Sequence, residues 1–109
     1  MIWEILFFET ARSEKIVKEF IKLLDISTIS KISSEIDLLK THGPFLGMPQ
    51  SKKLTRDLHE LRIRGRQEVR IIYGFVGNTI YLLHIFLKKT QKTPIKEVDT
   101  ASKRFQGLK

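Results

Sequence analysis

Apolar residues recur with two different periods along this chain, and these periods predict its secondary structure. A spacing of three and four residues is typical of a helix with one buried face, whereas short alternating or continuous apolar runs are typical of strands. The helical spacing occurs in three segments, residues 10–25, 27–43 and 93–105. The strand pattern occurs in four segments, residues 2–8, 58–64, 68–76 and 79–87. The predicted order is β-α-α-β-β-β-α, an α+β fold with a meandering antiparallel sheet.

Residues with preferences for helix ends indicate where the three helices begin and stop. Gly43-Pro44 is expected to end the second helix, and Pro94 is expected at the first position of the third. A hydroxyl oxygen at the N-cap accepts a hydrogen bond from a free backbone N–H group of the first turn. The expected N-caps are Thr10 or Ser13, Ser27 and Thr93.

The turns between the last three strands predict which side chains face one another, because side chains alternate along a strand. Gly77-Asn78 is a two-residue hairpin signal. It predicts the pairs Val76–Thr79, Tyr73–Leu82, Ile71–His84 and Arg70–Ile85. For the preceding hairpin we favour a three-residue loop at 65–67, because a loop of even length would place an apolar residue opposite an arginine. The pairs are then Ile63–Val69, Leu61–Ile71 and Arg62–Arg70.

This register predicts one apolar face and one mixed face of the sheet. The apolar face, on which we expect the helices to pack, carries Leu61, Ile63, Val69, Ile71, Tyr73, Phe75, Ile80, Leu82, His84 and Phe86. The mixed face carries Glu60, Arg62, Arg70, Ile72, Tyr81, Leu83, Ile85 and Lys89. Two directly opposed arginines repel each other unless an anion lies between them, and guanidinium groups bind phosphate oxygens in a forked geometry. We therefore expect an exposed face that binds phosphate.

Composition supports an anionic partner. The 109 residues fit one domain, residues 1–109, and 20 Lys and Arg against 12 Asp and Glu give a net charge of +8. Such an excess favours nucleic acid or another polyanion, although it also serves solubility. Most of the excess lies in residues 52–70 and 88–109. Three of these cations, Lys88, Lys89 and Lys92, lie in the segment that follows a predicted apolar strand.

Several classes of protein are not favoured by this sequence. It has no cysteine, so disulfide frameworks and thiolate metal sites are excluded, and a reducing cytoplasmic location is expected. The apolar runs are too short to span a membrane, and residues 2–8 are interpreted as a strand rather than a signal peptide. The three histidines lack metal-ligand spacing, and no phosphate loop or Ser or Cys nucleophile motif is present. We expect His84 to be a packed core residue, and no cofactor or metal.

Four short motifs occur in a fixed order: ELRIR, RIIY, FLKKTQKTP and a closing helix that contains an alanine. In this order they resemble the RelE/HigB superfamily of bacterial toxins, in its phage-derived branch. The resemblance implies a small twisted sheet with helices and a toxin of a type II toxin–antitoxin system. It further implies a metal-independent mRNA endoribonuclease (an mRNA interferase) that acts on the ribosome and inhibits translation. The implied partners are a helix-turn-helix antitoxin and mRNA on the ribosome.

The resemblance also indicates site residues. The residues that it places in catalysis are Arg70, Arg62, Glu60, Lys89 and Lys88, and it indicates Lys53 for RNA binding. The other residues expected to contact RNA, Lys52, Arg64, Arg66 and Lys92, belong to the basic segments described above. Arg70 with Arg62 suits stabilisation of a charged transition state, and Glu60 is the candidate base. Lys88 or Lys89 is the candidate acid, and strand alternation favours Lys89. Because this face is expected to be exposed, Arg70→Ala is expected to abolish toxicity without unfolding the protein.

Two other functions remain open. A toxin with the same fold could inhibit a DNA topoisomerase without cleaving RNA. An RNA-binding module without activity is the second alternative, because many superfamily members carry a Tyr or His near the C-terminus. The last residues of this chain, RFQGLK, contain neither. Fragments with cyclic phosphate ends would exclude both alternatives.

Overall fold

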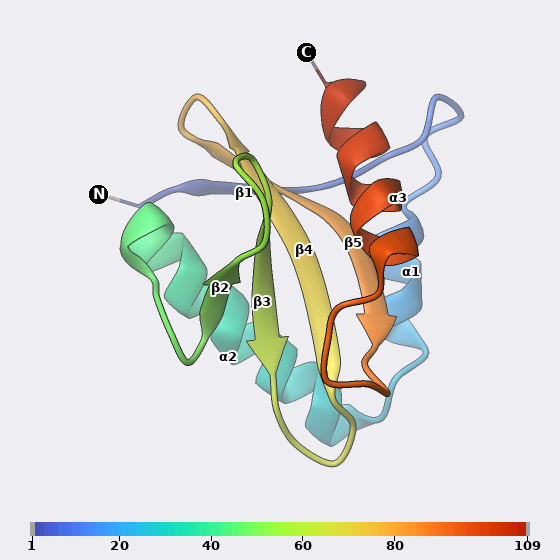
Figure 1. Cartoon of the computed structure of the whole chain (residues 1–109). Helices are drawn as coiled ribbons and strands as arrows, with labels where there is room; N and C mark the ends of the chain where they lie inside the picture. Colours follow the sequence, from blue (N-terminus) through green and yellow to red (C-terminus); the bar gives the residue numbers. More distant parts are fainter. Residues whose placement is uncertain (1, 109) are drawn as a thin grey trace.

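The predicted strands and helices are present in a computed structural model, which describes residues 2–108 (Figure 1). The strands are β1 (Glu4–Phe7), β2 (Ser51–Lys53), β3 (His59–Ile63), β4 (Val69–Val76) and β5 (Thr79–Leu87). The helices are α1 (Ile16–Lys22), α2 (Ile26–His42), the short 3-10 helix η1 (Gly43–Phe45) and α3 (Ile95–Gln106). The α+β class is therefore confirmed. Within residues 2–108, no helix combines the length and apolar character needed to cross a membrane.

The sheet is mixed rather than wholly antiparallel. Its five strands follow the order β1-β5-β4-β3-β2, and β1 runs parallel to β5 while the other neighbours are antiparallel. The antiparallel prediction was wrong for β1 because its pairing joins residues about 75 positions apart, with Glu4 opposite Thr79. Strand β2 was not predicted, since the Ser-Lys-Lys sequence has no apolar alternation. It adds to the sheet at the edge beyond β3.

The predicted helix starts were shifted in all three helices. Thr10 Oγ1 accepts hydrogen bonds from the N–H groups of Arg12 and Glu14, and Ser13 has a φ of 64°, so both belong to a turn and α1 begins later. The N-cap of α2 is Asp25, whose carboxylate accepts from the Thr28 N–H at 2.7 Å. The prediction of Ser27 as the N-cap was therefore wrong, and carboxylates are favoured at this position as much as hydroxyls are. The predicted end of α2 at Gly43 is confirmed.

The start of α3 differs in a way that matters for the site. Pro94 is the N-cap, and the side chain of Thr93 makes no capping bond to the helix. The Thr93 hydroxyl instead donates to the Glu60 carboxylate on β3, at 2.7 Å. The Thr93 hydroxyl, which was expected to cap α3, therefore bonds to Glu60, a residue distant in the sequence.

The helices cover both faces of the sheet, so the prediction that they pack on one face was wrong. Helices α1 and α2 lie behind the sheet in Figure 1 and contribute Val17, Ile32 and Leu39 to one buried cluster. Helix α3 lies on the opposite face, where Ala101 and Phe105 pack in a second buried cluster. An apolar stripe on a helix shows that it must be buried but not against which face of a sheet. Only the part of that second face beyond α3 is left for a ligand.

A bulge in β5 changes the predicted register. The pairs Val76–Thr79 and Tyr73–Leu82 are confirmed, as are the three pairs between β3 and β4. Beyond Leu82 the register shifts by one residue, so that Ile71 faces Ile85 and Arg70 faces Phe86. The extra residue is Leu83, and one extra residue moves every later side chain to the other face.

Because of the bulge, three residues of β5 lie on the opposite face of the sheet from the one predicted. Ile85 packs in the cluster under α1 and α2, whereas Phe86 packs in the cluster under α3. His84 also lies toward α3, where it contacts Glu97 and Arg104. Arg104 additionally donates to the carbonyl of Leu83 at 2.7 Å. The residues at the bulge are therefore the ones that α3 contacts. The regular apolar sequence of residues 79–87 does not reveal the bulge.

Gly74 permits the close packing of α3 on β4. A Cβ atom at this position would lie 2.7 Å from the Phe105 ring and 3.1 Å from the Asp57 carbonyl oxygen. We expect Gly74→Ala to lower the free energy of unfolding by about 1–3 kcal/mol, the usual cost of overpacking a core. Urea denaturation measures this change. Gly47→Ala is the matched control, because a Cβ atom at Gly47 would meet no other atom within 4 Å, and equal stability losses in both variants would contradict the explanation.

Candidate functional site

Charged residues of four strand segments meet on the part of the second face that α3 leaves uncovered. The register places Lys52 of β2 opposite Glu60 of β3, and Arg62 of β3 opposite Arg70 of β4. Lys88 directly follows β5, and its N–H group donates to the carbonyl of Glu68 at 2.7 Å. Glu60 and Arg62 are two residues apart on β3, and Glu68, which directly precedes β4, is two residues before Arg70. Alternation therefore keeps these side chains on one face.

A shallow hollow lies between the ends of these strands. It has a volume of about 520 Å³ and is lined by Arg62, Arg64, Glu68, Arg70, Lys88, Lys89, Thr90 and Gln91. Five of these eight residues are cations and only one is an acid. An open concave surface with this charge attracts polyanions and concentrates the field of its cations.

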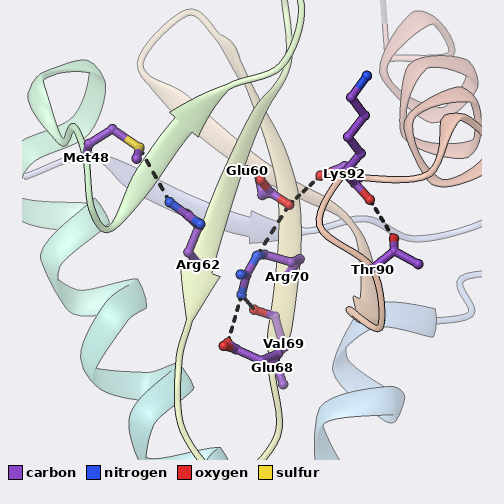
Figure 2. A network of polar contacts seen from close by, with 9 residues as sticks. Met48, Glu60, Arg62, Glu68, Val69, Arg70, Thr90 and Lys92 are labelled. Atoms are coloured by element: carbon purple, nitrogen blue, oxygen red, sulfur yellow. Dashed lines mark hydrogen bonds and ion pairs between the residues drawn. The ribbon is translucent and has the colours of Figure 1, made fainter.

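Arg70 is buried beneath this hollow, so the expectation that it is fully exposed was wrong. Only 3% of the residue is accessible. Its Nη1 donates to the Val69 carbonyl at 3.0 Å and lies 3.3 Å from Glu68 Oε2, while its Nε lies 3.5 Å from Glu60 Oε1 (Figure 2). Two carboxylates thus hold the guanidinium group against β4, and Arg70 contributes to the stability of the sheet.

Arg62 lies directly opposite Arg70 as predicted, but the two side chains diverge. In Figure 2 Arg62 points toward Met48, whose Sδ atom is 3.6 Å from Arg62 Nη1, whereas Arg70 points toward Glu60 and Glu68. Divergence and the two carboxylates relieve the repulsion that the sequence predicted. An anion between the guanidinium groups is therefore not required for the folded state.

Glu60 is also buried, with 1% of the residue accessible. Its Oε1 accepts the hydroxyl of Thr93 at 2.7 Å and lies 3.5 Å from Arg70 Nε. A carboxylate in this position is enclosed by protein groups. Its contacts hold side chains in place rather than leaving an oxygen free at the surface.

Glu68 is the acid that lines the hollow, and sequence reasoning did not select it. Its side chain is 44% exposed, and its Oε2 contacts Arg70 Nη1. The signal that could have found it is its spacing, two residues before Arg70, which puts both side chains on one face.

Lys88 lies within the charged cluster. Burial lowers the pKa of its ammonium group, and Arg70, Arg62 and Lys52 lower it further, whereas Glu60 opposes this shift. Lys88 is half-buried and Lys89 is exposed, although both line the hollow. Alternation without the Leu83 bulge favoured Lys89. The bulge reverses the alternation of β5 and turns Lys88 toward Arg70.

The remaining predicted RNA-contacting residues divide between the hollow and the periphery. Arg64 lines the hollow, and Lys52 lies near Lys88. Lys53 lies opposite His59, whose pKa is lowered by burial and secondarily by Lys53, so it belongs to the face of α2. Arg66 interacts with Asp25, whose pKa is lowered mainly by hydrogen bonds from Thr28. Lys92 is exposed, and Figure 2 shows its side chain extending away from Arg70.

His84 forms a separate polar cluster at the base of α3. Its Nε2 lies 2.9 Å from Glu97 Oε1, and Arg104 Nη1 lies 3.4 Å from its Nδ1. These contacts join β5 to α3 and do not reach the residues that line the hollow. Among residues 2–108, no group of three His, Asp or Glu side chains is placed to hold a metal ion.

Comparison with known proteins assigns the chain to a family. Residues 19–106 match the family described as phage derived protein Gp49-like (DUF891), whereas no curated protein matches the chain. The match includes α2, all strands from β2 to β5 and all of α3. A toxin family implies an antitoxin as partner. The chain belongs to the Gp49-like family of phage-derived proteins, a RelE/HigB-like toxin family.

Proposed function

We propose that this protein is a ribosome-dependent mRNA endoribonuclease that works without a metal ion and inhibits translation. The observation that carries the proposal is the hollow lined by Arg62, Arg64, Arg70, Lys88 and Lys89 around the single carboxylate of Glu68. RNA offers closely spaced phosphates to these cations. A carboxylate and a lysine with a lowered pKa at the same place supply groups that can accept and donate protons.

The proposed reaction uses the 2′-OH of the RNA as nucleophile. Its oxygen forms a bond to the adjacent phosphorus, and the bond from phosphorus to the 5′-oxygen of the next nucleotide breaks. The products are a 2′,3′-cyclic phosphate and a free 5′-OH. One proton leaves the 2′-OH, one is delivered to the departing 5′-oxygen, and the extra negative charge on the phosphorane needs stabilisation.

The roles of the carboxylates change in this proposal. Glu60 was the candidate base, but its enclosed position, its hydrogen bond from Thr93 and its ion pair with Arg70 keep it from a 2′-OH. Glu68 has an exposed carboxylate in the hollow and takes the role of base. Lys88 protonates the leaving oxygen, and Arg70 with Arg62 stabilises the phosphorane. Lys88 thus fills the role that other superfamily members give to a C-terminal Tyr or His.

Contacts to the RNA backbone account for affinity without sequence preference. Arg64 and Lys89 at the hollow, and Lys52 at the sheet edge, are placed to bind flanking phosphates. The proposed partners are mRNA on the ribosome and a helix-turn-helix antitoxin. The peripheral residues Lys53, Arg66 and Lys92 are proposed to contact the ribosome rather than the cleaved phosphate.

Primer extension on a reporter message in a purified translation system tests the function. Wild-type protein is expected to cut the message only when ribosomes translate it, and the upstream fragments should carry 2′,3′-cyclic phosphates. Uncut message with folded protein would overturn the proposal, and topoisomerase inhibition in a parallel supercoiling assay would then identify the alternative toxin.

A further inference from the structure

Thr93 connects the end of the lysine-rich segment to the buried charges below the hollow. Its hydroxyl donates to Glu60 Oε1 at 2.7 Å, and the same oxygen lies 3.5 Å from Arg70 Nε. Thr93 and Glu60 are 33 residues apart in the chain. We infer that Thr93 is a positioning residue of the proposed reaction, which holds Glu60 and through it Arg70. This inference rests on the proposed function and assigns a residue that the superfamily resemblance did not indicate.

The burial of Glu60 makes the Thr93 hydroxyl matter. A buried carboxylate oxygen that loses a hydrogen-bond donor must turn toward another donor or remain unsatisfied. Arg70 Nε is the other group beside this oxygen, so a rotation of the Glu60 carboxylate also shifts the Arg70 guanidinium group. The opposite end of that guanidinium is held by Glu68 and the Val69 carbonyl. Arg70 is therefore held between two carboxylates: that of Glu60, which Thr93 positions, and that of Glu68, which lines the hollow.

The segment from Lys88 to Thr93 is attached to the sheet at both ends. The N–H of Lys88 donates to the Glu68 carbonyl at 2.7 Å, and Thr93 is attached through Glu60. Figure 1 shows that this segment bends back near the start of β4 before α3 begins. Within it, Thr90 Oγ1 donates to the Lys92 carbonyl at 2.8 Å. Loss of the Thr93 anchor therefore alters the placement of Arg70 and frees one end of the segment that carries Lys88.

Substitutions at Thr93 test this role. Thr93→Val keeps the size of the side chain but removes the hydroxyl, and Thr93→Ser keeps the hydroxyl. Because a misplaced catalytic group costs rate more than binding, we expect Thr93→Val to lower the single-turnover cleavage rate about tenfold, with the half-saturating RNA concentration changed less than about twofold. Thr93→Ser should restore most of the rate. Thr41→Val is the matched control, because its exposed hydroxyl bonds only to the Asp37 carbonyl within α2, on the opposite face of the sheet.

A nuclear magnetic resonance measurement makes the inference independent of cleavage. The Nε–H signal of Arg70 should shift or broaden in Thr93→Val and remain at its wild-type position in Thr93→Ser and Thr41→Val. An unchanged rate and unchanged Arg70 signal in Thr93→Val would overturn the inference. So would an equal loss of rate in Thr93→Ser. If the wild type does not cut RNA, the proposed function fails, and the Arg70 signal still shows whether Thr93 sets the guanidinium.

Discussion

Arg70→Ala is expected to slow RNA cleavage strongly and to lower the free energy of unfolding by about 3–5 kcal/mol, because it leaves a buried carboxylate without its cation. Glu60 is 1% exposed and has Arg70 as its cationic neighbour at 3.5 Å. The rate should fall by about 10²–10³-fold in the molecules that remain folded, since one group that stabilises the transition state is lost. Urea denaturation and single-turnover cleavage measure the two effects.

A double variant separates stability from catalysis at this position. Replacing a buried ion pair by apolar residues of similar size is often neutral for stability. The variant Glu60→Leu/Arg70→Met is therefore expected to recover most of the stability lost in Arg70→Ala while remaining inactive. A stable Arg70→Ala protein would contradict the buried ion pair. Cleavage by the double variant at the wild-type rate would exclude Arg70 from the proposed site.

Lys88→Met is expected to lower the cleavage rate by about 10²–10⁴-fold, the usual effect of removing a general acid. Lys89→Met is the matched control, because this neighbouring lysine is exposed and its loss should mainly weaken RNA binding. Both substitutions remove one positive charge from the hollow. A difference between their cleavage rates would therefore arise from the position of the lysine and not from the net charge. Equal effects on rate at saturating RNA would contradict the role of Lys88.

The pH dependence of cleavage follows from the environment of Lys88. Burial, with Arg70, Arg62 and Lys52, lowers the pKa of Lys88 below the ordinary lysine value of 10.5. An acid must be protonated, so the rate should decline as pH rises through this lowered pKa. Lys52→Gln removes one of the cations and should move the decline to higher pH. A decline that stays at the same pH in this variant and in Lys88→Met would assign the titration to another group.

The same pKa predicts the sign of a stability effect. The pKa of Lys88 is lower in the folded state than in the unfolded chain, so the unfolded chain binds the proton more readily. Stability due to this group is therefore lowest below the folded-state pKa and increases as pH rises through it toward the unfolded value. At neutral pH Lys88→Met should be at least as stable as the wild type, so its loss of activity would not arise from unfolding.

The features that the sequence determined by itself are those that depend on neighbouring residues. The three strands from residue 58 to 87 follow from alternation, and the two hairpin turns set the pairing nearest to them. The opposition of Arg62 and Arg70 was correct because only five residues, 64–68, separate their strands. The end of α2 at Gly43 was correct because the glycine adopts a positive φ that other residues avoid.

Only the tertiary structure decided how these elements form the site. The parallel pairing of β1 with β5, the bulge at Leu83 and the placement of α3 on the second face all involve segments that are distant in sequence. The bulge exchanged the places of Lys88 and Lys89 relative to Arg70. The contact between Thr93 and Glu60 turned an expected helix cap into a support for a buried charge. Residue types and local periods specify which side chains can share a strand face, whereas burial and hydrogen-bond partners depend on how the whole chain packs.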